Sequence, residues 1–147
     1  MDWHANLIDD DAGLARILRE ARTVAVLGAK GDAGQPAYYV PAYLKAHGYR
    51  VLPVNPTRVG ERIFGEPVVA TLADLRESPD VVEIFRRPQF LQAHAAEIVR
   101  LARTPAVVWF QLGIRNDGAA ETLARVGIRV VQDRCMMPEH RRLLGAA

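Results

Sequence analysis

The chain has 147 residues, of which 50% are hydrophobic and 24% are charged, and this composition excludes an intrinsically disordered protein. A chain of this length folds around one core and exposes about 7,500 Å² of surface, so it has no room for two catalytic domains. The 19 Lys and Arg residues against 17 Asp and Glu give a net charge of +2 and form no basic run, which argues against a dedicated nucleic-acid-binding protein.

The cysteine content and the length of the apolar stretches predict where in the cell the protein is located. Cys135 is the single cysteine, so no intrachain disulfide can form and we expect a reducing compartment, the cytoplasm. The first residues lack the basic segment and apolar run of a signal peptide. The longest strongly apolar stretches, such as 106–110, are far shorter than the roughly 20 residues that cross a bilayer, so we expect no membrane contact.

An amphipathic helix is expected near the N-terminus. Residues 9–11 are three aspartates, which favour a helix start and are interpreted as caps and solvated charge rather than a metal site. The apolar positions that follow have helical spacing: Leu14, Ile17, Leu18 and Ala21. We interpret residues 1–21 as a helical extension that packs on the domain.

Five short apolar runs follow, rich in Val and Ile and continuous rather than alternating: Thr23–Leu27, Arg50–Val54, Val81–Phe85, Ala106–Phe110 and Ile128–Val131. Strands buried on both faces of a parallel sheet have this pattern. Helical segments alternate with them: 38–47, 71–77, 88–102, 117–126 and 138–144. The alternation predicts a Rossmann-like α/β fold, in which a doubly wound, parallel five-stranded sheet lies between two helical layers in one domain, residues 1–147.

The order of the strands and the ends of the elements are also predicted. The preferred strand order is 3-2-1-4-5, counting the runs along the chain. Gly48 and Gly127 each follow a helical segment, where a left-handed residue is expected, and Thr71 with Asp74 resembles a capping box. Pro53 lies inside the second run, and because proline cannot donate to a ladder, we expect the pairing to end or bulge there.

Ligands of open α/β sheets bind beyond the carboxyl ends of the strands, so the residues after each run form the candidate site. After the first run, residues 28–34 contain three glycines and precede a helix, which suits close approach of a phosphate to a helix N-terminus. If that helix begins near Tyr38, Pro41 lies in its first turn. The spacing is neither G-x-G-x-x-G nor a P-loop, and a merely tight turn is the alternative.

Basic residues follow several of the strands. No acidic residue follows the second run to hydrogen-bond the hydroxyls of a free ribose. Arg58, which follows it instead, favours a phosphorylated ribose. Arg86 and Arg87, after the third run, suit forked hydrogen bonds to phosphates, although surface salt bridges are the alternative. Up to six cations are expected around one crevice: Lys30, Arg58, Arg86, Arg87, Arg115 and Arg134.

Candidate catalytic residues are few. Packing is the favoured role for a lone cysteine at a strand end, and a nucleophilic pair of Cys135 and His140 is the alternative. The chain contains no metal-ligand spacing and no G-x-S-x-G elbow. We therefore predict no catalytic residue and no metal site.

Five motifs of this chain, in the same order, resemble those of the CoA-binding domain family, the stand-alone relatives of the N-terminal domain of the succinyl-CoA synthetase α-subunit. They are VAVLG at 24–28, PVNP at 53–56, VEIFRRP at 82–88, WFQLGI at 109–114, and DRC at 133–135 followed by Glu139 and His140. The resemblance runs from about residue 22 to 144. It implies a Rossmann-like, nucleotide-binding fold that holds coenzyme A (CoA) and has no reaction of its own.

The resemblance also implies roles for particular residues, all near the carboxyl ends of strands. The pyrophosphate would be held by Gly28, Ala29 and Lys30. The adenosine and its 3′-phosphate would meet Asn55, Pro56 and Arg58, with Val54 beside them. The wall around the adenine and phosphates would be formed by Phe85, Arg86, Arg87 and Phe90. The pantetheine path would be lined by Gln111, Gly113 and Ile114.

The leading hypothesis is non-catalytic binding of CoA or an acyl-CoA. The synthetase half-reaction needs a phosphohistidine and a second ligase domain, so His140 is not assigned that role. Two alternatives stay open. One is a small NAD(P)-dependent oxidoreductase in which Arg58 holds the 2′-phosphate of NADP. The other is a redox-regulatory module in which Cys135 forms a mixed disulfide with the CoA thiol.

Overall fold

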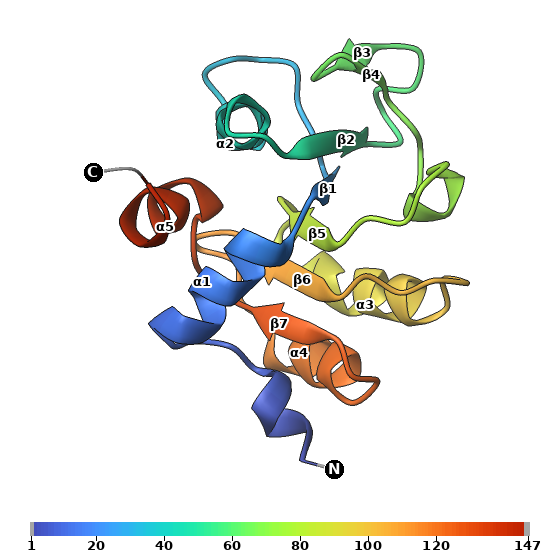
Figure 1. Ribbon diagram of the computed structural model, residues 1–147. Helices are drawn as coiled ribbons and strands as arrows, with labels where there is room; N and C mark the ends of the chain where they lie inside the picture. The colour runs from blue at the N-terminus through green and yellow to red at the C-terminus, as the bar shows by residue number, and fades with distance from the viewer. Residues whose placement is uncertain (1, 146–147) are drawn as a thin grey trace.

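The computed structural model describes residues 2–145 and contains a five-stranded parallel sheet with helices on both faces (Figure 1). The strands of this sheet are β1 (Thr23–Leu27), β2 (Arg50–Val54), β5 (Val81–Ile84), β6 (Val107–Phe110) and β7 (Arg129–Val131). Their buried Val and Ile residues pack on both faces, as the continuous apolar runs indicate. The predicted α/β class with a parallel five-stranded sheet is confirmed.

Helices cover the two faces of the sheet in separate layers (Figure 1). One face carries α1 (Asp11–Glu20), α2 (Pro36–Ala46) and α5 (Met136–Leu143). The other carries α3 (Leu91–Val99) and α4 (Asp117–Ala124). Short 3₁₀ helices are η1 (Trp3–Asn6), η2 (Leu72–Asp74) and η3 (Pro88–Phe90). No helix within residues 2–145 is long and apolar enough to span a membrane.

The strand order is β2-β1-β5-β6-β7, which is 2-1-3-4-5 when the predicted strands are counted along the chain. The predicted order 3-2-1-4-5 is therefore wrong: β5 pairs with β1, from Val24 opposite Val81 to Leu27 opposite Ile84, and β2 lies at the edge. Both orders obey the right-handed crossover rule, so the sequence of elements alone does not separate them. In the observed order the direction of winding reverses between β1 and β5. Ligands of doubly wound sheets bind in the crevice at the carboxyl ends of two such strands.

Pro53 does not interrupt β2, contrary to expectation. Its pairing partner is Val26, and the register continues to Val54 opposite Leu27 without a bulge. The Pro53 carbonyl accepts a hydrogen bond from the Val69 N–H on the outer side of the sheet. In a parallel strand the nitrogen of a residue points to the same side as its carbonyl, so the missing donor faces away from β1 and the ladder loses no bond.

The boundaries of α2 also differ from the prediction. The helix begins at Pro36, so Pro41 lies in its interior rather than in its first turn. A proline leaves the carbonyl four residues earlier without its helical donor. That carbonyl belongs to Ala37, and the Lys30 N–H donates to it over 3.4 Å. Pro41 thereby ties the loop after β1 to the first turn of α2.

Other predicted ends are partly confirmed. Gly48 and Gly127 adopt left-handed φ angles of +97° and +88°. The Thr71 N–H and hydroxyl both donate to the Asp74 carboxylate, at 3.1 and 2.9 Å, although the helix they open is only the short η2. The segment predicted as helix 88–102 divides into η3 and α3. The hairpin of β3 (Arg62–Ile63) and β4 (Glu66–Pro67) was not predicted.

The N-terminal residues pack along the outer edge of β7. Leu7 forms a parallel bridge with Val130, whose carbonyl accepts from the Ile8 N–H at 2.9 Å. Asp10 caps α1 by accepting the Gly13 N–H at 3.2 Å, in agreement with the interpretation of the aspartates as caps. The apolar side of α1 is buried against the sheet through its predicted residues: Leu14, Ile17 and Leu18.

Candidate functional site

A cleft of about 430 Å³ lies at the carboxyl ends of β1, β5, β6 and β7, next to the first turn of α2 and the start of α5. We call it the basic cleft. Its lining residues are Lys30, Gln35, Pro36, Ala37, Tyr39, Phe85, Arg86, Arg87, Pro88, Gln111, Leu112, Ile114 and Cys135. This is the position that a doubly wound sheet offers to a ligand, beside the reversal between β1 and β5.

Three cations in the wall of the basic cleft have no acidic counterpart. Lys30, Arg86 and Arg87 form no ion pair with any Asp or Glu of residues 2–145, and the lining contains no acidic side chain. The Arg86 guanidinium lies 5.0 Å from the centre of the Phe90 ring, which orients it by a cation–π contact. Uncompensated positive charge in a concave surface attracts anionic ligands.

The other three predicted cations do not line this cleft. The Arg58 guanidinium lies 3.5 Å from the Glu61 carboxylate, and Arg115 lies 3.3 Å from that of Asp117. Arg134 pairs with two carboxylates, at 2.7 Å with Asp9 and 3.2 Å with Glu139. The expectation of six cations around one crevice is therefore wrong for half of them, because acidic neighbours neutralise these three elsewhere on the surface.

The close approach of β1 and β5 depends on Gly28. Its φ angle is +91°, and a Cβ at this position would lie 2.7 Å from the Phe85 carbonyl oxygen and 3.3 Å from Arg86 Cδ. Only glycine accommodates both the left-handed backbone and this contact. Gly28 therefore sets the distance between the loop after β1 and Arg86 in the wall of the cleft.

The backbone donors of the predicted pyrophosphate loop are partly occupied. The Val54 carbonyl accepts from the N–H groups of Gly28 and Ala29, at 2.9 and 3.4 Å, and Lys30 donates to Ala37. The next N–H groups, at positions 31–33, have no acceptor among residues 2–145. The donors available to a phosphate thus lie just after the three residues that the family resemblance indicates, within the same glycine-rich loop.

Asn55 braces the loop rather than the cleft wall. The residue is 8% exposed, and its Nδ2 donates to the Ala29 carbonyl at 2.9 Å. Its Oδ1 accepts from the Thr57 N–H and hydroxyl, at 3.0 and 2.8 Å. Four residues predicted to contact the ligand lie at the end of β2 and do not line the basic cleft: Val54, Asn55, Pro56 and Arg58.

The loop after β6 forms another wall of the cleft. The Ile114 N–H donates to the Gln111 carbonyl at 2.9 Å, and Gly113 turns this loop with a φ of +83°. The Gly113 N–H donates to Asp133 Oδ1 at 2.7 Å, which joins the loop to the one after β7. Gln111 and Ile114 line the cleft, as predicted for a ligand path, whereas Gly113 shapes the turn outside it.

Cys135 lies in the cleft wall and does not pair with His140. The last helix begins at Met136, two residues before the predicted start, and this makes Cys135 its N-cap residue. The His140 Nδ1 is 2.8 Å from the Tyr43 hydroxyl of α2 instead. Burial, with a smaller contribution from His47, lowers the pKa of His140. A Cys135–His140 nucleophilic pair is therefore absent from the described structure.

A buried carboxyl group lies on β5, in the strand that ends at Arg86. Glu83 is fully buried between Val26 and Trp109, and neither of its carboxyl oxygens has a hydrogen-bond partner within residues 2–145. Burial raises its pKa to about 8, so the group is protonated and neutral at pH 7. At that pH the Glu83 side chain therefore carries no negative charge.

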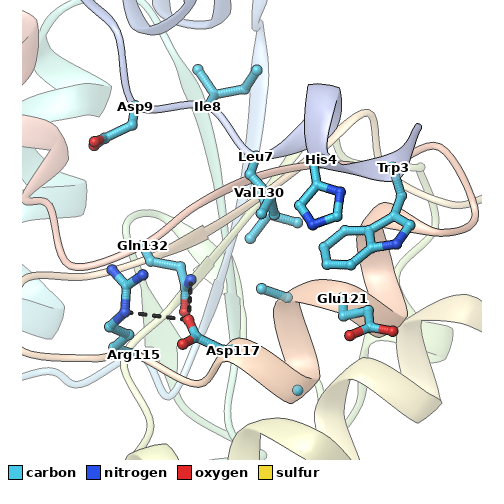
Figure 2. Close-up of a pocket in the computed structure, with 12 residues that line it drawn as sticks. Trp3, His4, Leu7, Ile8, Asp9, Arg115, Asp117, Glu121, Val130 and Gln132 are labelled. Atoms are coloured by element: carbon cyan, nitrogen blue, oxygen red, sulfur yellow. Dashed lines mark hydrogen bonds and ion pairs between the residues drawn. The ribbon is translucent and has the colours of Figure 1, made fainter.

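A second hollow, of about 450 Å³, lies between the N-terminal segment, β7 and α4 (Figure 2). We call it the N-terminal hollow. Its charged groups include both signs: Arg115 pairs with Asp117, and the Gln132 amide donates to the same carboxylate at 3.1 Å. Its lining residues are Trp3, His4, Leu7, Ile8, Asp9, Arg115, Asp117, Gly118, Ala120, Glu121, Val130 and Gln132.

Comparison with known proteins identifies relatives of this chain in sequence and in fold. The family model described as "CoA binding domain" matches residues 22–141. YneT of Bacillus subtilis (strain 168), an uncharacterized protein, is 30% identical over 129 residues, which are 88% of this chain and 93% of YneT.

Two solved structures show the same architecture over nearly the whole chain. Cell-free ID.343 from Thermus thermophilus is 48% identical with a TM-score of 0.87, covering 92% of this chain and 100% of that one. A hypothetical protein from Pyrococcus horikoshii OT3 is 32% identical with a TM-score of 0.86, covering 93% and 94%. The family model spans the glycine-rich loop, the basic strand ends and Cys135, and the chain therefore belongs to the CoA binding domain family.

Proposed function

We propose that this protein binds coenzyme A or an acyl-CoA in the basic cleft and catalyses no reaction on it. The observation that carries the proposal is the set of three unneutralised cations, Lys30, Arg86 and Arg87, in a wall without acidic side chains. CoA carries a pyrophosphate and a 3′-phosphate. Charge-assisted hydrogen bonds from guanidinium and ammonium groups are the strongest contacts that such phosphates make with side chains.

The rest of the cleft suits the uncharged part of the same ligand. Phe85, Leu112 and Ile114 provide apolar wall toward the ends of β6 and β7, and the Gln111 side chain provides a polar group there. A pantetheine arm alternates apolar segments with amides and ends in a thiol. We propose that the phosphates lie near the loop after β1 and that the arm extends toward Cys135.

The absence of catalysis is proposed from the chemistry of the lining. General acid–base catalysis uses His, Asp or Glu within reach of the reacting group, and none of these residue types lines the described cleft. The free thiol of Cys135 suits a reducing compartment, and we propose the cytoplasm as the place of action. The proposed partner is a small molecule rather than a nucleic acid or a membrane.

Isothermal titration of the reduced protein with CoA, 3′-dephospho-CoA and NADP tests the proposal. We expect one CoA per chain and weaker binding of dephospho-CoA, because one phosphate is lost. The matched control is Arg115→Ala in the N-terminal hollow, which should bind CoA as the wild type does. No heat of binding with CoA at millimolar concentration, or tighter binding of NADP than of CoA, would overturn the proposal.

A further inference from the structure

We infer that the basic cleft is also a covalent site, in which Cys135 exchanges with the disulfide of coenzyme A and retains one CoA as a mixed disulfide. The inference rests on the proposed function, since CoA must first occupy the cleft. Cys135 is half-buried, lines the cleft, and stands as the N-cap residue of α5. Its thiol is therefore accessible from the space in which the pantetheine arm is proposed to end.

Gln111 is a second feature of this end of the cleft that suits a ligand, independent of Cys135. The residue is 4% exposed and lines the cleft, and its Oε1 accepts the Met136 N–H at 3.2 Å. Because only the oxygen can accept that bond, the orientation of the amide is fixed. Its Nε2 donates to no acceptor within residues 2–145.

The Nε2 atom is not itself fully buried, so this donor is open to the cleft and can reach a molecule that enters it. A ligand carbonyl in the cleft would satisfy it, and the pantetheine arm carries two amide carbonyls. The anchoring N–H belongs to Met136, the residue directly after Cys135. The unpartnered donor and the thiol thus lie on adjacent parts of one wall, so an arm held by Gln111 ends near Cys135.

The covalent step is a thiol–disulfide exchange. The Cys135 thiol loses its proton to solvent, and its sulfur attacks one sulfur of CoA disulfide. The S–S bond of the disulfide breaks as the new bond to Cys135 forms, and the departing CoA thiolate takes up a proton. Cys135 is oxidised, one half of the disulfide is reduced, and no further oxidant is required.

The composition of the chain determines how long the adduct lasts. Cys135 is its single cysteine, so no second thiol of the same chain can resolve the mixed disulfide. Release then requires an external thiol. The occupied state would accordingly follow the ratio of CoA disulfide to free thiols around the protein.

The test measures the rate of adduct formation by intact-mass spectrometry with two probes, CoA disulfide and cystamine. Cystamine is a disulfide without the nucleotide. We expect CoA disulfide to modify the wild type at least about tenfold faster, because binding in the cleft raises the local concentration of the disulfide near the thiol. Acetyl-CoA, which cannot exchange, should slow the CoA disulfide reaction by occupying the cleft, and Cys135→Ser should give no adduct.

A variant series links the rate to the cleft. Arg86→Ala should reduce the rate ratio of the two probes toward one, whereas Arg115→Ala should keep it. Binding of acetyl-CoA to the wild type, measured by titration, separates the two claims. Binding of acetyl-CoA with equal rates for both probes, or with no adduct, overturns the covalent site and leaves the proposed function intact. Absence of acetyl-CoA and CoA binding overturns the proposed function, and the covalent site with it.

Discussion

The basic cleft and the N-terminal hollow are almost equal in size, about 430 and 450 Å³, but they differ in how their charges are compensated. In the hollow, Arg115 faces Asp117 at 3.3 Å, and two further acidic side chains, Asp9 and Glu121, lie in the wall. In the cleft, Arg86 and Arg87 face no acidic group within residues 2–145. The basic cleft therefore differs from the N-terminal hollow in its uncompensated positive charge and not in its volume.

The difference follows from where each cation lies along the chain. Arg58, Arg115 and Arg134 are each followed within five residues by an acidic residue that pairs with them in the fold. Arg86 and Arg87 are followed by η3 and α3, whose first acidic residue is Glu97. Burial raises the pKa of Glu97, and the structure gives it no contact with the arginines. The absence of acidic neighbours leaves the charge of the cleft free for a ligand.

Removing the free charge should have the largest effect on binding. We expect Arg86→Ala combined with Arg87→Ala to weaken CoA binding by about 3–5 kcal/mol, since each charged hydrogen bond contributes about 1.5–3 kcal/mol and neighbouring contacts are not fully additive. Titration calorimetry measures the change. The matched Arg115→Ala variant should keep the wild-type dissociation constant, and equal losses in both variants would erase the distinction between the two regions.

A change in cleft geometry without loss of charge should have the next largest effect. Gly28→Ala places a methyl group against the Phe85 carbonyl at a φ of +91°. We expect the free energy of unfolding to fall by about 1–3 kcal/mol, because a left-handed non-glycine residue and the forced shift are both unfavourable. Urea denaturation measures the loss. Gly48→Ala has a similar φ but no contact within 4 Å, so it should cost less; equal costs would contradict the contact argument.

The buried Glu83 carboxyl makes the free energy of unfolding depend on pH. The pKa of Glu83 is about 8 in the folded state and near 4.5 in the unfolded one. Between these values the folded state holds a proton that the unfolded state has lost, so stability falls as pH rises, by up to about 1.4 kcal/mol per pH unit. The stabilising contribution is complete below pH 4.5 and lost above about pH 8.

Glu83→Gln removes this titration. The difference in free energy of unfolding between variant and wild type, measured by urea denaturation from pH 5 to pH 8, should shift progressively in favour of the variant. Parallel curves for the two proteins would mean that Glu83 does not titrate in this window. CoA affinity in the wild type should also decrease above pH 8, because a buried negative charge then opposes the free cations.

Arg58 should have the smallest effect. The family resemblance assigns the 3′-phosphate to Arg58, but the structure pairs Arg58 with Glu61 outside the cleft. We expect Arg58→Ala to leave CoA binding nearly unchanged, because Arg58 does not line the cleft and its loss removes only an exposed ion pair with Glu61. A loss as large as that of Arg86→Ala would extend the binding site to the end of β2.

Much of the fold is predictable because buried parallel strands carry continuous apolar runs. The run 23–27 and the glycine-rich segment after it identify β1 and its loop, and the same logic places Arg86 at the end of β5. The strand order is not predictable in this way, because β5 can lie beside β1 or β2 without breaking the crossover rule. The structure pairs β5 with β1, with Val24 opposite Val81.

The candidate site is predictable only in part, because distant contacts decide which groups remain free. Arg58 and Arg86 look alike in sequence, and the difference between them is a carboxylate near the first alone. Cys135 lines the cleft because α5 starts at Met136, whereas Pro138 suggests a later start. The orientation of the Gln111 amide depends on the Met136 N–H, 25 residues away in the chain. A local sequence pattern cannot predict such a contact.

Amide chemical-shift changes on titration with CoA, followed by NMR, test the central claim most directly. The account predicts that the largest changes fall on residues 31–33, 86–87 and 111–114 and on Cys135, with little change in residues 3–9 and 117–121 of the N-terminal hollow. Changes concentrated in the hollow, or spread evenly over the chain, would contradict it.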